Sequence, residues 1–304
     1  MRFANNRVLF VIARVFQILV AAVFLIAATL KALDPAAFAE QIAMYEIFPH
    51  LSHVAALTLI LVEVLLATAL VVNIFPRVFS LLMIALLIFF IGITWYGMSI
   101  GLGEGCGCFG NLVHRGPEQV ILEDVIMLLM MVFAATVLWH RPQSRAWWRI
   151  GVTAFAGVLA AVTIALSPYI PADDLVTQLR AGAEFTSWPV DGLFGTDLNS
   201  GTRVVFLFSV HSDDLQRDVN RMNEIAQQDE VTSAVGLIVD GTEHLTSLMF
   251  EYAAAFPIGA VEPRFARPLY RRLPRVFVLR DGVVTHAWSE LPSPIAVVKA
   301  VRSR

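Results

Sequence analysis

The sequence is poor in cysteine and in charged residues, and each shortage excludes a class of protein. The 304 residues include two cysteines, Cys106 and Cys108, so a framework of several disulfide bonds does not hold this fold together. Charged residues make up 15% of the chain and the formal net charge is −3, a balance that gives no sign of nucleic-acid binding. Neither a disulfide-stapled domain nor a nucleic-acid binder therefore fits this composition.

Hydrophobic residues are abundant: they make up 57% of the chain, and the mean hydropathy is +0.69. The long apolar runs occur in the first 170 residues or so, whereas the remainder has the charge density of a soluble domain. A bilayer core about 30 Å thick requires roughly 20 apolar residues in a helix. Five segments meet or approach this length: 8–30, 54–74, 78–102, 120–139 and 148–166. We therefore expect an all-α transmembrane bundle of about five spans, followed by a soluble α/β domain.

The first apolar run is too long for the h-region of a signal peptide and ends at no clear cleavage site, so we interpret it as an uncleaved span. We expect a membrane bundle over residues 1–140, a fifth helix and its linker over 141–174, and an extracytoplasmic domain over 175–304.

Lysine and arginine are distributed unevenly between the two sides of the predicted bundle. Six lie on the side of the amino terminus (Arg2, Arg7, Arg77, Arg141, Arg145 and Arg149), and two lie on the other side (Lys31 and Arg115). Because positive residues are retained in cytoplasmic loops, this bias predicts a cytoplasmic amino terminus in a bacterial inner membrane. Five crossings then place the carboxyl-terminal domain in the periplasm, together with the loop that contains both cysteines.

Ionisable and polar residues inside the predicted spans need a partner or a purpose. Glu63 lies about 14 Å from the outer end of the second span, and Arg14 about 10 Å from the cytoplasmic end of the first, at 1.5 Å per residue. One interpretation is structural: a buried ion pair between Glu63 and Arg14, or a hydrogen bond between Glu63 and Gln17. The other is a proton or ligand site. Glu123 and Asp124, at the start of the fourth span, are expected to be interfacial.

Cys106 and Cys108 are separated by one glycine in a loop with glycines at 103, 105, 107 and 110. A disulfide across three residues is geometrically tight and contributes only about 1.6 kcal/mol by restricting the unfolded chain. Such a bridge is a poor staple and a better exchangeable redox couple. Two alternatives stay open: a soft-metal site for Cu(I), which two thiolates leave incomplete, and an inert local bridge.

Three features of the membrane half resemble the MauE family of methylamine-utilisation membrane proteins, relatives of the DoxX group. They are the segment after the first span (Lys31, Asp34, Pro35 and Phe38, then Tyr45), Glu63 in the second span, and the run Cys106-Gly107-Cys108-Phe109-Gly110. The resemblance covers about residues 8–140. It implies a polytopic inner-membrane protein that assists disulfide formation or electron supply during maturation of a periplasmic dehydrogenase subunit. The family core commonly has four spans, so the fifth span and the added domain depart from it, and methylamine is an inherited label.

The soluble half predicts strand 202–210, helix 215–227, strand 234–240, helix 243–254, a hairpin of 275–279 and 283–288, and helix 292–301. This order resembles the thioredoxin fold, and its membrane-tethered TlpA-like members in particular, with Pro274 at the family's cis-proline position. Where those relatives carry Cys-x-x-Cys, this chain has Ser212-Asp213-Asp214-Leu215, so the domain cannot exchange thiols. We interpret Ser212 as a helix N-cap. His211 beside it suggests a nucleophile, but no matching acid is visible.

Five arginines gather before and at Pro274: Arg264, Arg267, Arg271, Arg272 and Arg275. They are interpreted either as a solvated helix face or as a basic docking surface for an acidic partner or lipid headgroups.

Three functions are consistent with these features. The first is a redox-associated assembly factor, in which Cys106 and Cys108 exchange disulfides and the cysteine-less domain binds clients near Pro274, Ser212 and His211. The second is a non-redox scaffold that binds client protein. The third is a small-molecule or quinone-binding membrane protein that uses Glu63. We expect no resident cofactor and no metal, since neither quinone nor Cu(I) has specific support, and no enzymatic activity beyond thiol exchange or electron relay. The expected partners are an extracytoplasmic client or redox protein and membrane lipid.

Overall fold

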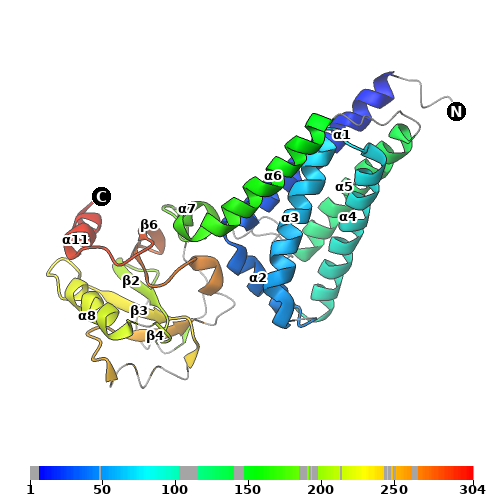
Figure 1. Ribbon diagram of the computed structural model, residues 1–304. Helices are drawn as coiled ribbons and strands as arrows, with labels where there is room; N and C mark the ends of the chain where they lie inside the picture. The colour runs from blue at the N-terminus through cyan, green and yellow to red at the C-terminus, as the bar shows by residue number, and fades with distance from the viewer. Residues whose placement is uncertain are drawn as a thin grey trace. The chain divides into compact units, whose positions relative to one another are not determined.

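The computed structural model describes residues 7–303 apart from positions 48, 103–115, 140–146, 171, 185–189, 192, 194–197, 213, 243–244, 246–247, 249–250 and 262–265. The chain divides into two compact units, Met1–Ala172 and Asp173–Arg304. The first unit is helical and the second is built on a β-sheet (Figure 1).

The first unit contains five helices long and apolar enough to cross a membrane, which confirms the predicted bundle. They are α1 (Arg7–Leu33), α3 (Ser52–Val71), α4 (Pro76–Ser99), α5 (Pro117–Leu138) and α6 (Trp147–Leu166), and short 3-10 turns precede α3 (Pro49–Leu51) and follow α6 (Ser167–Tyr169). The second span was predicted to run to residue 74, but α3 ends at Val71. Asn73 and Phe75 take positive φ in the tight connection to α4, which the apolar composition of this segment conceals.

Successive long helices run in opposite directions, side by side (Figure 1). Lys31 near the end of α1 contacts Glu63 in α3, whereas Arg14 near the start of α1 contacts Asn73 just beyond the end of α3. Lys31 also lies over the ring of Phe90 in the second half of α4. The ends of α1 and α4 therefore lie together with the starts of α3 and α5; we call this the α2 end of the bundle.

Small residues allow the helices of the bundle to approach closely. Ala13, Ala21 and Ala28 of α1 are fully buried, and Ala67 of α3 is buried in the same cluster as Ala21. In a membrane the hydrophobic effect does not drive helices together, so they associate through van der Waals packing. Small side chains at the interface let the backbones approach closely enough for that packing. Many large apolar side chains remain exposed on the outer faces, which is the distribution expected for a surface that contacts lipid.

A short helix, α2 (Pro35–Met44), follows α1 and was not predicted as a separate element. Its N-cap is Asp34, whose carboxylate accepts a hydrogen bond from the Ala37 backbone N–H at 3.1 Å, and Pro35 occupies the first turn. Both features are typical of a helix start. They end α1 at Leu33 and redirect the chain, so that α2 packs on α3.

The second unit contains a six-stranded sheet in the order β1-β4-β3-β2-β5-β6. The strands are β1 (Val190–Asp191), β2 (Thr202–Phe208), β3 (Ala234–Ile238), β4 (Ile258–Val261), β5 (Arg275–Arg280) and β6 (Val283–Trp288). β2 pairs in parallel with β3 and antiparallel with β5, and β5 and β6 form an antiparallel hairpin. With α8 (Leu215–Ala226) between β2 and β3 and α11 (Pro294–Arg302) at the end, this is the thioredoxin-like arrangement expected from the sequence.

Alternating side chains of the central strands fill two hydrophobic layers. Phe206 and Phe208 of β2 pack with Val219 of α8 and Val297 of α11 on one face. Val205 and Leu207 of β2 pack on the other face with residues such as Leu179 and Leu269. Because β2 is buried on both faces from Val204 to Phe208, that part of its sequence is continuously apolar rather than alternating.

The predicted hairpin is confirmed, and Asp281 and Gly282 form its two-residue turn with φ of 50° and 78°. Positive φ at both positions is typical of the type I′ turn, which glycine adopts without steric cost. The Leu273–Pro274 peptide bond is cis, as predicted. Half of the residues of the predicted helix 243–254 lie outside the description. Strands β1 and β4 were not predicted.

Candidate functional site

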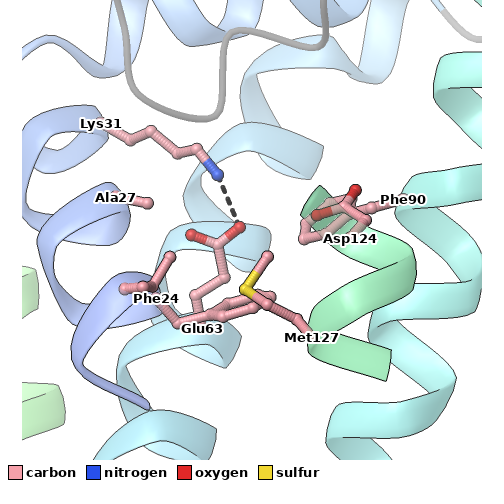
Figure 2. A pocket seen from close by; sticks show the side chains of 8 residues that line it. Phe24, Ala27, Lys31, Glu63, Phe90, Asp124 and Met127 are labelled. Atoms are coloured by element: carbon pink, nitrogen blue, oxygen red, sulfur yellow. Dashed lines mark hydrogen bonds and ion pairs between the residues drawn. The ribbon is translucent and has the colours of Figure 1, made fainter. Parts of the chain in front are cut away.

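Three ionisable side chains are buried together inside the bundle (Figure 2). Lys31 of α1, Glu63 of α3 and Asp124 of α5 are 4%, 0% and 5% exposed. The Lys31 Nζ donates a hydrogen bond to Glu63 Oε1 at 2.6 Å, which makes a buried ion pair. Asp124 lies across from this pair and interacts electrostatically with Lys31. We call these three residues the buried cluster.

Two aromatic rings complete the surroundings of the Lys31 ammonium. Its Nζ lies 4.7 Å from the ring centroid of Phe38 in α2 and 5.4 Å from that of Phe90 in α4. Aromatic faces attract cations, most strongly where water is excluded. Phe38 lies in the first turn of α2, so the Asp34 cap and Pro35 hold its ring over Lys31. The family features at Lys31, Asp34, Pro35, Phe38 and Glu63 thus form one structural unit.

The buried cluster borders a cavity of about 20 Å³, which has room for a water molecule. The apolar side of this cavity is formed by Val23, Phe24, Ala27, Phe90 and Met127. Two carboxylate oxygens of residues that line it, Glu63 Oε2 and Asp124 Oδ2, are buried without a hydrogen-bond partner among the described residues. Unsatisfied polar groups at membrane depth are costly, so these two oxygens mark a place where a small polar guest is favoured.

The predicted partners of Glu63 are wrong. Arg14 and Gln17 do not reach Glu63: the Arg14 guanidinium donates to Gln17 Oε1 at 2.6 Å and to the backbone oxygens of Leu70 and Val71, each at 3.2 Å. Gln17 in turn donates to Ser80 Oγ at 2.8 Å. Arg14 extends toward the end of α3, where carbonyl oxygens lack helical partners. Glu63 lies two turns deeper and is reached by Lys31 from the opposite end of α1.

The interfacial placement predicted for Asp124 is also wrong. Asp124 is buried and lines the cavity, whereas Glu123, one residue earlier, is partly exposed. Neighbouring residues on a helix point about 100° apart, so one faces the bundle and the other its edge. The position near the start of α5 was correct, but the direction of the side chain is set by packing against α1 and α4.

Tyr45, the remaining family feature near α2, packs against α4. A Cβ atom added to Gly97 would lie 2.7 Å from Tyr45 Cε1, so a glycine at this position lets the ring approach the helix. Burial raises the pKa of the Tyr45 phenol. This contact ties the end of α2 to the end of α4.

The predicted redox couple, Cys106 and Cys108, lies outside the described residues, as do Phe109 and Gly110 of the same motif. The described residues on each side are Leu102, just beyond the end of α4, and Gly116, the N-cap of α5. The described helix ends that flank the cysteine segment in the sequence, the end of α4 and the start of α5, both lie at the α2 end. Asp124 follows the start of α5 by seven residues, which is about 10 Å along the helix.

In the second unit, the segment after β2 is held by carboxylates. Asp240, just beyond β3, accepts hydrogen bonds from the Val210 N–H at 2.6 Å and from Ser209 Oγ at 3.1 Å. The predicted N-cap role of Ser212 is wrong: the N-cap of α8 is Asp214, and Ser212 Oγ donates to Asp218 at 3.3 Å. His211 follows on the exposed side of this segment. Since the Ser212 hydroxyl donates to a carboxylate of α8, this arrangement does not favour a nucleophile.

The arginine group before Pro274 does not form a solvated face or a docking surface as a whole. Arg275 is 1% exposed, and its guanidinium donates to Thr177 Oγ1 and to the Leu269 carbonyl, each at 2.7 Å. Arg267 is buried and donates to the Tyr270 carbonyl at 2.6 Å, with its guanidinium over the Tyr270 ring. Arg272 is exposed, and Arg264 lies outside the described residues. Arg267 and Arg275 thus bind backbone carbonyls, and Arg271 pairs with Asp173 at 4.0 Å. A charge count cannot distinguish such roles from a surface patch.

Sequence reasoning identified Glu63 but missed its grouping with Lys31 and Asp124. Lys31 was assigned to a loop because the apolar run stops at residue 30, whereas α1 continues to Leu33. Two acidic residues and one basic residue, each within two or three turns of the same end of the predicted bundle, were the available signal.

Comparison with known proteins matches the helical unit to a family. The model of the methylamine utilisation protein MauE matches residues 9–140, which includes the buried cluster and the cysteine segment. No curated protein matches the chain. A thioredoxin-related protein from Neisseria meningitidis serogroup B resembles this chain with a TM-score of 0.30 and 14% identity, over 38% of this chain and 96% of that one. From the family match and the sheet topology, the protein is a multi-pass membrane protein that joins a MauE-like helical region to a thioredoxin-like α/β domain.

Proposed function

We propose that the protein is a redox-associated assembly factor that exchanges disulfides with extracytoplasmic client proteins through Cys106 and Cys108. One observation carries this proposal: both cysteines of the chain lie one glycine apart in the segment between α4 and α5, inside the range that matches MauE. A disulfide that closes so short a loop stabilises little, which favours exchange over structure. The name of the family suggests an amine dehydrogenase subunit as one client.

The proposed chemistry is thiol–disulfide exchange. A client thiolate attacks one sulfur of the Cys106–Cys108 disulfide, and the other sulfur leaves as a thiolate. A second client thiolate then attacks the mixed disulfide, so the client gains the disulfide. Both cysteines of this chain finish as thiols, having taken up the two protons that the client thiols released. Two electrons pass from client to chain, and a thiol oxidant in the same compartment restores the disulfide.

The proposed location is the bacterial inner membrane, with the amino terminus in the cytoplasm. Arg7 begins α1, Arg77 lies in the first turn of α4 and Arg149 in the first turn of α6, all at the end of the bundle opposite α2. Positive residues concentrate on the cytoplasmic side, which supports a cysteine segment that faces outward. Disulfides persist in that compartment.

The proposed role of the second unit is to bind the client. The cysteine-less domain has no thiol of its own, and an extended client segment can pair with backbone near Pro274, beside Ser212 and His211. Strand addition of this kind draws its affinity from main-chain hydrogen bonds. Binding by one unit then raises the local concentration of client thiols near the other.

The test is to capture the mixed disulfide. Cells producing Cys108→Ala are quenched with acid, alkylated and separated without reductant. We expect a new species of higher mass that contains this chain and a client and collapses on reduction. The matched control lacks both native cysteines and carries Ser99→Cys, a single thiol at the exposed end of α4, and should capture far less of that client.

Two outcomes would refute the redox function. One is equal capture by the control thiol, which would mean that any thiol at this end suffices. The other is normal maturation of the captured client in cells that produce the Cys106→Ser/Cys108→Ser protein at normal abundance. That result would support the non-redox scaffold instead.

A further inference from the structure

The charges of the buried cluster do not balance. With Lys31 protonated and both Glu63 and Asp124 ionised, the cluster carries one positive and two negative charges. All three side chains are at least nine-tenths buried in helices that cross the membrane. An uncompensated charge in such surroundings is strongly unfavourable. One further positive charge at this site would restore neutrality.

The unsatisfied atoms of the cluster point to where that charge binds. Lys31 satisfies Glu63 Oε1, while Glu63 Oε2 and Asp124 Oδ2 have no partner among the described residues. All three residues line one space, and Figure 2 shows Asp124 across from the Glu63–Lys31 pair, with the Glu63 oxygen that Lys31 does not contact directed away from Asp124. That space is the cavity of about 20 Å³, large enough for one water and too small for an organic ligand.

Other charged groups on the surrounding helices do not supply the missing charge within the described part of the chain. Toward the cavity, α1 contributes Lys31, α3 contributes Glu63 and α4 contributes the apolar ring of Phe90. On α5 itself, Glu123 precedes Asp124 and adds negative charge nearby. Arg14 is committed to Gln17 and the end of α3.

We propose that Lys31, Glu63 and Asp124 form a binding site for one proton. The proton resides on Asp124 as a carboxylic acid, which donates a hydrogen bond to one water in the cavity. The bound form has no net charge, so no uncompensated charge stays buried between the helices. The reaction is the addition of one proton to one carboxylate, and no electrons are transferred.

This site is distinct from the proposed disulfide exchange. It requires neither cysteine, so the Cys106→Ser/Cys108→Ser protein should retain it. Release of the proton at alkaline pH leaves one net negative charge between α1, α3 and α5. Proton occupancy is therefore coupled to how these helices pack at the α2 end.

The test is infrared spectroscopy of the full-length protein in lipid nanodiscs at neutral pH. We expect a carbonyl stretching band of a buried carboxylic acid that disappears on titration to alkaline pH. Labelling the aspartate carboxyl carbons with ¹³C should shift this band, whereas labelling glutamate should not. The Asp124→Asn protein should lose the band, and Glu123→Gln, the matched control, should keep it.

Three results would overturn the proposal: absence of the band in the wild-type protein, a band that shifts with labelled glutamate alone, or a band that sodium ions suppress in proportion to their concentration. The last would assign the site to a metal cation. The labelling experiment uses the unaltered protein, so it tests whether the band comes from an aspartate even if Asp124→Asn fails to fold.

Discussion

At the scale of single residues, the buried cluster depends on Lys31. Its ammonium is bonded to Glu63, lies over two aromatic rings and faces Asp124. A buried ion pair contributes little compared with an apolar pair of the same size, but removing one partner leaves the other charge uncompensated. The difference between single and double replacement therefore measures the pairing itself.

We expect Lys31→Met to destabilise the purified protein by about 3–5 kcal/mol, seen as a lower midpoint of thermal unfolding. The double variant Lys31→Met/Glu63→Leu should recover most of that loss, because neither charge remains. Glu118→Gln, in the exposed first turn of α5, is the control and should change little. Equal midpoints for the single and double variants would show that Lys31 and Glu63 are not energetically coupled.

Arg275 is the corresponding residue in the second unit. It is buried and donates to Thr177, Leu269 and Leu179, so Arg275→Met leaves three acceptors without this donor. Each buried group left unsatisfied costs roughly 1–3 kcal/mol. We expect a clear loss of resistance to limited proteolysis in the second unit, whereas Arg272→Met, at an exposed position, should behave like the wild type. If both substitutions have the same effect, Arg275 does not have the structural role assigned to it.

At the scale of elements, α2 connects the family features to the bundle. Its cap places Phe38 over Lys31, and Tyr45 at its end packs on Gly97 of α4. In the sequence these residues were identified one by one, and the segment that contains them was not predicted to be a helix. Asp34 and Pro35 are a local signal for the start of a helix, and a helix there brings Phe38 and Tyr45 to the bundle. We interpreted the two residues only as part of a family motif.

We expect Gly97→Ala to destabilise the protein by about 1–3 kcal/mol, since the added methyl group overlaps the Tyr45 ring. Gly92→Ala on the same helix is the matched control, because a Cβ there meets no atom within 4 Å. That change should be neutral or stabilising by up to about 1 kcal/mol, since alanine favours helix. Thermal unfolding of the two variants side by side checks this, and a Gly97→Ala protein as stable as Gly92→Ala would contradict the contact.

The sequence predicted the elements better than the site, for a physical reason. Helix length and the Asp281-Gly282 turn are local properties, so the five spans and the hairpin followed from the residues. The rotation of a helix about its axis is not a local property in a membrane: the apolar residues of α3 and α5 are spread around each helix, and no amphipathic stripe indicates that Glu63 and Asp124 face inward. Strand β4 was missed because its four residues follow a proline and give too short a pattern.

At the scale of the whole molecule, the chain combines two units with different chemistry. The MauE-like region holds both cysteines and the buried cluster, and the thioredoxin-like domain has the fold of a thiol exchanger without its thiols. This division is consistent with the proposed function, in which the helical unit exchanges disulfides and the thioredoxin-like unit binds the client protein. It requires that the cysteine segment face the compartment in which clients fold.

The most direct measurement of this requirement is the labelling of Cys106 and Cys108 in intact cells with a membrane-impermeant maleimide after mild reduction. The chain contains no other cysteine, so every label reports these two positions. We predict full labelling before the membrane is permeabilised, with Cys106→Ser/Cys108→Ser unlabelled. Labelling that appears only after permeabilisation would place the thiols in the cytoplasm and contradict both the orientation and the proposed exchange with extracytoplasmic clients.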